Sequence, residues 1–268
     1  MHKTVRKVLR AVADYDPDYF DMYADQAEAM FARLYVERIL RHASAAGIRP
    51  PASLLEAGCQ AGRLVVPFAK AGFRVTGIDT SGFALRRARE HAKAAGVEAA
   101  FVQGDLLTVL RRRPAPQFDL VVCAEVVYLS PQHRQMLEAL AAAVRPGGLL
   151  CVSHRPKMYY LLEALRQYDG ASAAEVLRRG EGPFRDSAYY NWQTQDELRA
   201  LYRSLGLRCI ALHPIDRLAW LGQVDVKRLS QAQRAQWVQW ELELPDEAAG
   251  GFARYLLVVA QRPAAAHT

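Results

Sequence analysis

The sequence predicts an α/β protein with a mostly parallel sheet and helices on both of its faces. From residue 53 onward, short apolar runs alternate with stretches of helical periodicity, as in parallel strands joined by right-handed crossovers. The nearly continuous apolar run 118–123 indicates a strand that is buried on both faces. The first run ends in a turn that contains Gly58 and Gly62 and leads directly into a helical pattern.

The individual elements follow from this alternation and from the residues that stop each pattern. The expected strands span residues 53–57, 73–78, 99–102, 118–123, 149–153, 207–212 and 252–260. The expected helices span residues 27–45, 63–71, 82–95, 131–144, 158–166, 194–204 and 231–240. A tight turn is expected at 145–148 and a turn-rich segment at 180–183, and Thr194 with Glu197 forms a capping-box pattern. Together they predict a Rossmann-like, seven-stranded sheet.

The regular alternation is absent before residue 51 and lapses twice after strand five. We therefore expect an N-terminal helical cap at 1–50, a core at 51–154 and an insertion or substrate lid at 155–192. Residues 193–268 would complete the core and carry a second insertion, after strand six, at about 214–251. The acidic and aromatic stretch 14–23 either packs within the helical cap or covers a ligand.

Composition limits the class of protein. The 268 residues are 51% hydrophobic and 24% charged, which is ordinary for a globular chain with a sizeable core. No apolar run approaches the roughly 18 residues of a membrane span, and the basic start is not typical of a signal peptide. The four cysteines lack C-x-x-C spacing, so we expect free buried thiols, no metal site and a cytoplasmic location. The net charge of +7 leaves a nucleic-acid partner open without favouring it.

Four sequence features would meet at the carboxyl edge of the sheet, where open parallel sheets bind their ligands. The two glycines follow strand one, Asp79 ends strand two, Asp105 follows strand three, and residues 125–128 follow strand four. Asp79 lies 21 residues after Gly58, close to the spacing of about 20 at which a carboxylate reaches a ribose hydroxyl. As an alternative, Asp79 or Asp105 simply caps the helix behind it.

The glycine spacing distinguishes between cofactor classes. A dinucleotide fingerprint that starts at Gly58 needs glycine at positions 60 and 63, where this chain has Gln60 and Arg63. The phosphate loop G-x-x-x-x-G-K-[ST] is also absent. The spacing G-x-G-x-G is matched at two of its three positions, Gly58 and Gly62.

With these motifs the sequence resembles the class I S-adenosylmethionine-dependent methyltransferases, closely over residues 53–154 and more loosely over 193–212. The matching stretches are Leu55-Glu56-Ala57-Gly58-Cys59-Gln60-Ala61-Gly62, Gly77-Ile78-Asp79-Thr80-Ser81, Gln103-Gly104-Asp105-Leu106, Phe118-Asp119-Leu120-Val121 and Arg145-Pro146-Gly147-Gly148. The resemblance implies S-adenosyl-L-methionine as the cofactor. It implies contacts to that cofactor from Glu56, Gly58, Gln60, Gly62, Asp79, Thr80, Asp105, Leu106, Glu125 and Tyr19.

Within that set, Glu56, Gly58 and Gly62 would surround the methionine part. Asp79 would bind the ribose diol, and Asp105 with Leu106 would hold the adenine. Gln60 departs from the family pattern, which has a middle glycine there, and we expect its side chain to be turned aside. Tyr128 stands where many members that act on small molecules carry histidine.

The implied reaction is transfer of a methyl group to an oxygen or nitrogen of a small-molecule acceptor by in-line displacement. His154, at the carboxyl end of strand five, is the candidate general base, with a structural histidine as the alternative. The candidate substrate contacts are Tyr128, Tyr159, Tyr189, Tyr190 and Trp192, which favour an aromatic or apolar acceptor unless they only pack the insertion onto the sheet. An RNA- or protein-directed methyltransferase and a non-catalytic cofactor-binding regulatory protein remain alternatives.

Overall fold

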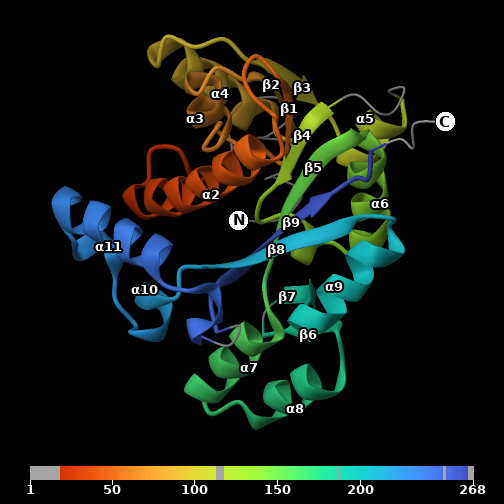
Figure 1. The fold of residues 1–268 in the computed structure, drawn as a ribbon. Coiled ribbons are helices and arrows are strands. Elements are labelled where there is room, and N and C mark those ends of the chain that lie inside the picture. Colours follow the sequence, from red (N-terminus) through yellow and green to blue (C-terminus); the bar gives the residue numbers. More distant parts are fainter. Residues whose placement is uncertain (1–18, 113–117, 186, 250–251, 265–268) are drawn as a thin grey trace, which may run out of the picture.

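The computed structural model describes residues 19–112, 118–185, 187–249 and 252–264, and its centre is a seven-stranded sheet (Figure 1). The strand order is β3-β2-β1-β4-β5-β9-β8, in which β1 to β5 are parallel and β9 runs antiparallel to both of its neighbours. The strands are β1 (Ser53–Ala57), β2 (Arg74–Asp79), β3 (Ala100–Gln103), β4 (Phe118–Cys123), β5 (Val144–His154), β8 (Arg208–Ile215) and β9 (Tyr255–Gln261). The predicted Rossmann-like α/β fold is confirmed.

Helices cover both faces of this sheet (Figure 1). On one face lie α2 (Gln26–Ala45), α3 (Val65–Lys70) and α4 (Gly82–Ala94), and on the other lie α5 (Leu106–Arg111), α6 (His133–Ala143) and α9 (Gln195–Ser204). Successive side chains of a strand point to opposite faces of the sheet. Leu54 therefore packs under α2, α3 and α4, and Leu55 packs under α5, α6 and α9. Both leucines are fully buried, as expected for a central parallel strand.

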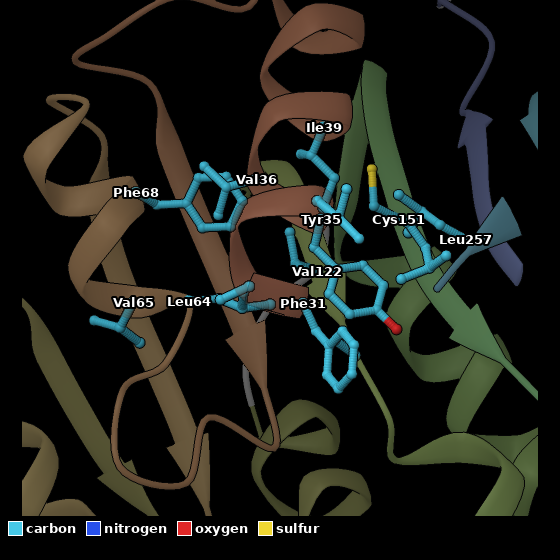
Figure 2. Packing of buried hydrophobic residues seen from close by; sticks show 14 of the residues in the cluster. Phe31, Tyr35, Val36, Ile39, Leu64, Val65, Phe68, Val122, Cys151 and Leu257 are labelled. Carbon is cyan, nitrogen blue, oxygen red and sulfur yellow. The ribbon is translucent and has the colours of Figure 1, made fainter. Parts of the chain in front are cut away.

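Helix α2 packs directly on the sheet. Asp25 caps its first turn by accepting hydrogen bonds from the backbone N–H groups of Ala27 and Glu28. Its apolar face carries Phe31, Tyr35 and Ile39 into the core beside Val122 and Cys151 of the sheet (Figure 2). The helix thus supplies one layer of the core. The division of the chain into a cap, a core and two insertions stays a prediction.

The remaining elements lie beyond the carboxyl ends of the central strands. Helices α7 (Lys157–Arg166) and α8 (Gly170–Arg178) pack with a hairpin of β6 (Glu181–Phe184) and β7 (Ser187–Asn191) around Tyr160, Phe184 and Trp192. Helices α10 (Leu218–Leu221) and α11 (Gln231–Glu243) follow β8, and α11 packs against α2. Short 3₁₀ helices span Val127–Leu129, Val226–Arg228 and Asp246–Ala249.

Three local expectations were wrong. Residues 145–148, expected as a turn, belong to β5, because Val144 pairs with Phe118 before a register shift and the N–H of Gly147 donates to the carbonyl of Arg262. Residues 180–183, expected as a turn-rich segment, contain β6, since pairing with β7 satisfies their backbone groups. The expected helices did not include α8 and α10, which are short and have little sequence in which to show periodicity, whereas the helix expected behind Asp105 as an alternative is α5.

Candidate functional site

A cleft with a volume of about 490 Å³ opens at the carboxyl edge of the sheet. This size lies within the roughly 300–1,000 Å³ typical of small-molecule and cofactor sites. The predicted site residues that line it are Glu56, Gly58, Gln60, Asp79, Thr80, Asp105, Leu106, Glu125 and Tyr128. Residues that follow four different strands therefore meet in one cleft, as the topology requires.

The turn after β1 holds its shape through backbone hydrogen bonds. The N–H groups of Gly58 and Cys59 both donate to the carbonyl of Ile78, at 2.8 and 3.0 Å. Gly58 has a φ of +79°, and a Cβ built on it would lie 2.3 Å from Cγ2 of Val126. Glycine is therefore required here for both its conformation and its size. Gly62 also has a positive φ, but it faces Ala88 of α4 and does not line the cleft.

Asp79 links the end of β2 to this turn. Its carboxylate accepts a hydrogen bond from the backbone N–H of Gln60 at 2.8 Å and one from the backbone N–H of Ser81 at 2.9 Å. The cap of α4 is Ser81, whose hydroxyl accepts from the N–H of Ala84. Asp79 thus fixes the loop and lies on the cleft wall instead of capping the helix itself.

The side chain of Gln60 is tied to the N-terminal segment. Its Oε1 accepts hydrogen bonds from the backbone N–H groups of Met22, at 3.3 Å, and Ala61, at 2.9 Å, and its Nε2 donates to the carbonyl of Phe20. With φ at +43°, its backbone adopts the conformation that favours glycine. The amide is therefore bonded to backbone groups of residues 20, 22 and 61, while Gln60 remains one of the residues that line the cleft.

Asp105 both caps a helix and lines the cleft. Its carboxylate accepts a hydrogen bond from the backbone N–H of Thr108 at 2.9 Å and one from the Thr108 hydroxyl at 3.0 Å. Leu106 follows it directly and also reaches the cleft. Asp105 can therefore cap α5 and still present its carboxylate to a ligand in the cleft.

Glu56 carries an unsatisfied carboxylate oxygen inside the cleft wall. The residue is buried, and its Oε2 has no hydrogen-bond partner. Burial raises the pKa of the Glu56 carboxyl to about 8, although the Arg63 charge and the N–H of Val65 oppose the shift. A buried acid of this kind is suited to a ligand that brings a positive charge or a hydrogen-bond donor.

Arg63, which also lines the cleft, forms ion pairs with two acidic residues, and the sequence did not reveal these contacts. Its guanidinium is buried and pairs with Glu125 at 2.8 Å and with Glu28 of α2. Glu125 has a φ of +62°, and its N–H donates to the hydroxyl of Ser153 at 2.6 Å. In the sequence, Arg63 was notable only because the dinucleotide fingerprint has glycine at that position. Nothing in its local pattern indicates ion pairs with residues 35 and 62 positions away.

His154, the candidate base, is not brought to the cleft. Successive residues of a strand face opposite sides of the sheet: Ser153 bonds to the Glu125 side, and His154 contacts the Tyr202 hydroxyl of α9 at 2.9 Å. Burial lowers the pKa of the imidazole to about 3. His154 therefore has the position of a structural histidine, which was the alternative to a general base.

The aromatic candidates separate into two groups. Tyr128 is buried and lines the cleft, and Tyr190 of the hairpin stacks near its ring at 6.4 Å between centroids. Trp192 lies in the core of the insertion, where its Nε1 donates to the carbonyl of Arg179. The hydroxyl of Tyr189 lies 2.9 Å from Nδ1 of His133, outside the cleft lining. Tyr159, Tyr190 and Trp192 are likewise not lining residues.

The N-terminal segment reaches the cleft through a residue that was not predicted. Met22 lines the wall, whereas Tyr19 packs edge-on against Phe83 at 4.8 Å and Tyr23 stacks on His91 at 4.2 Å. Residues 14–18 of the expected aromatic stretch lie outside the described residues. Two further unpredicted lining residues are Arg155, which follows β5, and Tyr255, which begins β9.

The described residues contain no cluster of three or more metal-ligating side chains. Cys59, Cys123 and Cys151 are buried and Cys209 is half-buried, all as free thiols. Within the described part of the chain, none of the helices has the length and apolar character needed to cross a membrane.

The chain is similar to known methyltransferases in sequence and in fold. The model of the "Methyltransferase domain" family matches residues 54–148. The magnesium protoporphyrin IX methyltransferase of Synechocystis PCC 6803, solved with bound SAH, superposes with a TM-score of 0.59 at 17% identity, over 97% of this chain and 98% of that one. A methyltransferase from Clostridium acetobutylicum gives a TM-score of 0.57 at 10% identity and covers 97% and 98% of the two chains.

Curated relatives are similar over part or most of the chain. The ubiquinone biosynthesis O-methyltransferase of Azotobacter vinelandii is 29% identical over 76% of this chain and 85% of its own length. The protein of the same name from Alkalilimnicola ehrlichii is 38% identical over 42% of this chain and 49% of its own. The chain spans about half of the length of the latter relative and of a second one from Aeromonas salmonicida, at 49% and 47%.

Proposed function

The chain belongs to the class I S-adenosylmethionine-dependent methyltransferases, and on that basis we propose that it transfers a methyl group from S-adenosyl-L-methionine to an oxygen of a small aromatic or apolar acceptor. The observation that carries the proposal is the meeting, in one cleft, of the glycine turn, Asp79, Asp105 and the unsatisfied Glu56. The names of the curated relatives favour oxygen over nitrogen. A cytoplasmic location remains part of the proposal.

The residues present fit the cofactor from one end to the other. Asp79 and Asp105 present carboxylates at the ends of β2 and β3, where a ribose diol and an adenine amino group need acceptors. The orphaned carboxylate oxygen of Glu56 suits the ammonium group of the methionine part. Gly58 allows the turn to adopt its positive φ and to pack closely against Val126, which also lines the cleft.

When bound, the cofactor would supply a methyl group on a positively charged sulfur; the oxygen–methyl bond would form as the sulfur–methyl bond breaks, leaving a neutral thioether, with the hydroxyl proton released to solvent. The chain's residues act by binding and orientation. Arg63 holds the Glu125 carboxylate in place, while Tyr128 closes the acceptor end with an apolar ring that excludes water. Because His154 is buried outside the cleft, we assign no residue to proton removal.

A non-catalytic cofactor-binding protein is the second candidate, favoured by the departure at Gln60. The hydrogen bonds of its amide to residues 20–22 weaken this alternative, because they direct the side chain to the cleft wall. Cofactor binding without turnover over a broad panel of hydroxylated aromatic acceptors would favour it. An RNA-directed enzyme would instead show a strong, salt-dependent association with RNA.

Isothermal titration calorimetry with S-adenosylmethionine and S-adenosylhomocysteine tests the proposal directly. We expect both compounds to bind one site per chain. No heat from either at about 1 mM, which corresponds to a binding free energy weaker than about 4 kcal/mol, would exclude the proposed function.

A further inference from the structure

Arg155 stands at the far end of the cleft, surrounded by aromatic rings. It follows β5 directly, and its guanidinium carbon lies 4.8 Å from the ring centroid of Tyr128, 4.5 Å from that of Tyr159 and 4.9 Å from that of Tyr255. All three distances are within the range of about 6 Å for cation–π contact. Arg155, Tyr128 and Tyr255 line the cleft, so the charge faces the space that a ligand would occupy.

The charge of Arg155 has no carboxylate partner in the described part of the chain. Its Nη2 donates to the hydroxyl of Tyr255 at 2.9 Å, and its Nε is buried without a hydrogen-bond partner. Glu125, an acidic residue of the same cleft, is engaged by Arg63 at 2.8 Å. Arginine remains protonated at any ordinary pH, and a charge removed from water is costly unless an anion compensates it.

The position of Arg155 separates it from the residues proposed to bind the cofactor. In the sheet, β5 lies beyond β4, two strands from β1 with Glu56 and three from β2 with Asp79. At about 4.8 Å between neighbouring strands, these separations are roughly 10 and 14 Å. Arg155 is therefore on the acceptor side of the site, on the opposite side from Asp105.

We propose that Arg155 binds a carboxylate of the methyl acceptor, so that the acceptor is an aromatic acid whose ring lies against Tyr128 and Tyr255. The inference rests on the proposed methyltransferase function and deepens it by naming the substrate class. Arginine is the residue best matched to a carboxylate, because its planar fork donates two parallel hydrogen bonds. The Arg155 side chain packs against the tyrosine rings, and its Nη2 is bonded to the Tyr255 hydroxyl while its Nε has no hydrogen-bond partner, so donors remain for a ligand.

The test compares aromatic acids with their uncharged amides. Wild-type protein saturated with S-adenosylhomocysteine is titrated with benzoate, 3-hydroxybenzoate and 3,4-dihydroxybenzoate, and with the amide of each. We expect at least one acid to bind tenfold or more tightly than its amide. If no acid binds more tightly than its amide while S-adenosylhomocysteine binds normally, the inference is wrong and the proposed function still stands.

Variants test whether the preference for an acid over its amide depends on the Arg155 side chain. In Arg155→Met the preference for the acid should fall to less than twofold, whereas Arg155→Lys should retain part of it. Arg49→Met, which alters an exposed arginine, is the matched control and should keep the full preference. A preference that persists in Arg155→Met would overturn the assignment. If Arg155→Met does not fold, Tyr255→Phe, which removes the hydroxyl bonded to Nη2, should reduce the preference, and an unchanged preference would contradict the inference.

The carboxylate of the cofactor itself is the competing ligand for Arg155. Arg155→Met and wild type are therefore titrated with S-adenosylhomocysteine and with 5′-methylthioadenosine, which lacks that carboxylate. We expect equal affinities for both compounds in the two proteins. A tenfold loss for S-adenosylhomocysteine alone would assign Arg155 to the cofactor and overturn the inference.

Discussion

The backbone N–H of Gln60 donates a hydrogen bond to the carboxylate of Asp79 at 2.8 Å. The bond joins the turn after β1 to the end of β2, and the N–H of Ser81 occupies the other oxygen of the same carboxylate. Asp79 is thereby fixed in orientation before any ligand arrives. Gln60, at which this chain departs from the family's glycine pattern, thus positions Asp79, the residue proposed to bind the ribose. It does so through its backbone N–H, which every residue type except proline provides.

Replacing Asp79 by Asn should weaken S-adenosylhomocysteine binding by tenfold or more. The amide loses the negative charge that two backbone donors and the proposed ribose hydroxyls share, and bonds to charged groups contribute about 1.5–3 kcal/mol each. Calorimetry measures the change, with Asp196→Asn, an exposed acid of α9, as the control. Equal affinities of Asp79→Asn and wild type would contradict the assigned role.

Gly58→Ala should destabilise the protein more than Gly47→Ala does. Both glycines have a positive φ, at +79° and +75°, so both variants incur backbone strain of about 1–2 kcal/mol. Only at position 58 does the new Cβ meet another atom, Cγ2 of Val126 at 2.3 Å, which adds an overpacking cost of about 1–3 kcal/mol. Urea unfolding gives both values, and equal losses would show that the contact with Val126 is unimportant.

Gln60→Gly should loosen residues 20–22 without greatly changing cofactor affinity. The variant removes the acceptor for the Met22 amide, whose net hydrogen bond contributes about 0.5–1.5 kcal/mol, so hydrogen exchange at Met22 should accelerate roughly two- to tenfold. S-adenosylhomocysteine affinity should change by less than about threefold, or 0.7 kcal/mol. Gln223→Gly is the matched control, since Gln223 is exposed and has a similar φ of +52°. A large loss of affinity in Gln60→Gly alone would show that the amide contacts the cofactor.

Stability should fall between pH 4.5 and 8 through Glu56. Burial raises the pKa of its carboxyl to about 8 in the folded protein, against about 4.5 in the unfolded chain. In this window the folded state therefore binds more protons than the unfolded state, so the free energy of unfolding decreases as pH rises, by at most about 5 kcal/mol. Glu56→Gln should lack this component in urea unfolding at pH 5 and pH 8, while the exposed control Glu98→Gln keeps it. A wild-type slope in Glu56→Gln would refute the assignment.

Cofactor binding should release a proton from Glu56 at pH 7. The free protein holds the carboxyl largely protonated, whereas an ammonium group placed beside it favours the carboxylate. Calorimetry of S-adenosylhomocysteine binding in buffers of different ionisation enthalpy counts the protons released. We expect up to one for wild type and none for Glu56→Gln, and equal counts would show that Glu56 does not meet the ammonium group.

The sheet was predictable from sequence because its strands are short apolar runs between clear breakers. Strands Ser53–Ala57 and Phe118–Cys123 have the expected bounds, and Thr194 and Glu197 form the expected capping box. The hairpin of β6 and β7 was not predictable, since Gly182 and Pro183 are typical of turns and only pairing with residues 187–191 makes that segment a strand.

The cleft was predictable where it depends on strand ends, and not where it depends on contacts between distant segments. Asp79 and Asp105 follow strands, so the topology alone brings them together. Arg63 and Arg155 reach the cleft through ion pairs and ring contacts with residues far away in the chain, which leave no local pattern. His154 illustrates the opposite limit: its strand end was predicted correctly, but the alternation of the strand turns it to the other face.

A crystal structure with S-adenosylhomocysteine bound is the most direct test of the central claim, that this cleft is a cofactor site. We expect the adenine beside Leu106, the ribose hydroxyls on Asp79 and the ammonium group on Glu56, with Gln60 still bonded to residues 20–22. Electron density for the compound outside this cleft, or an adenosine without contact to Asp79, would contradict it.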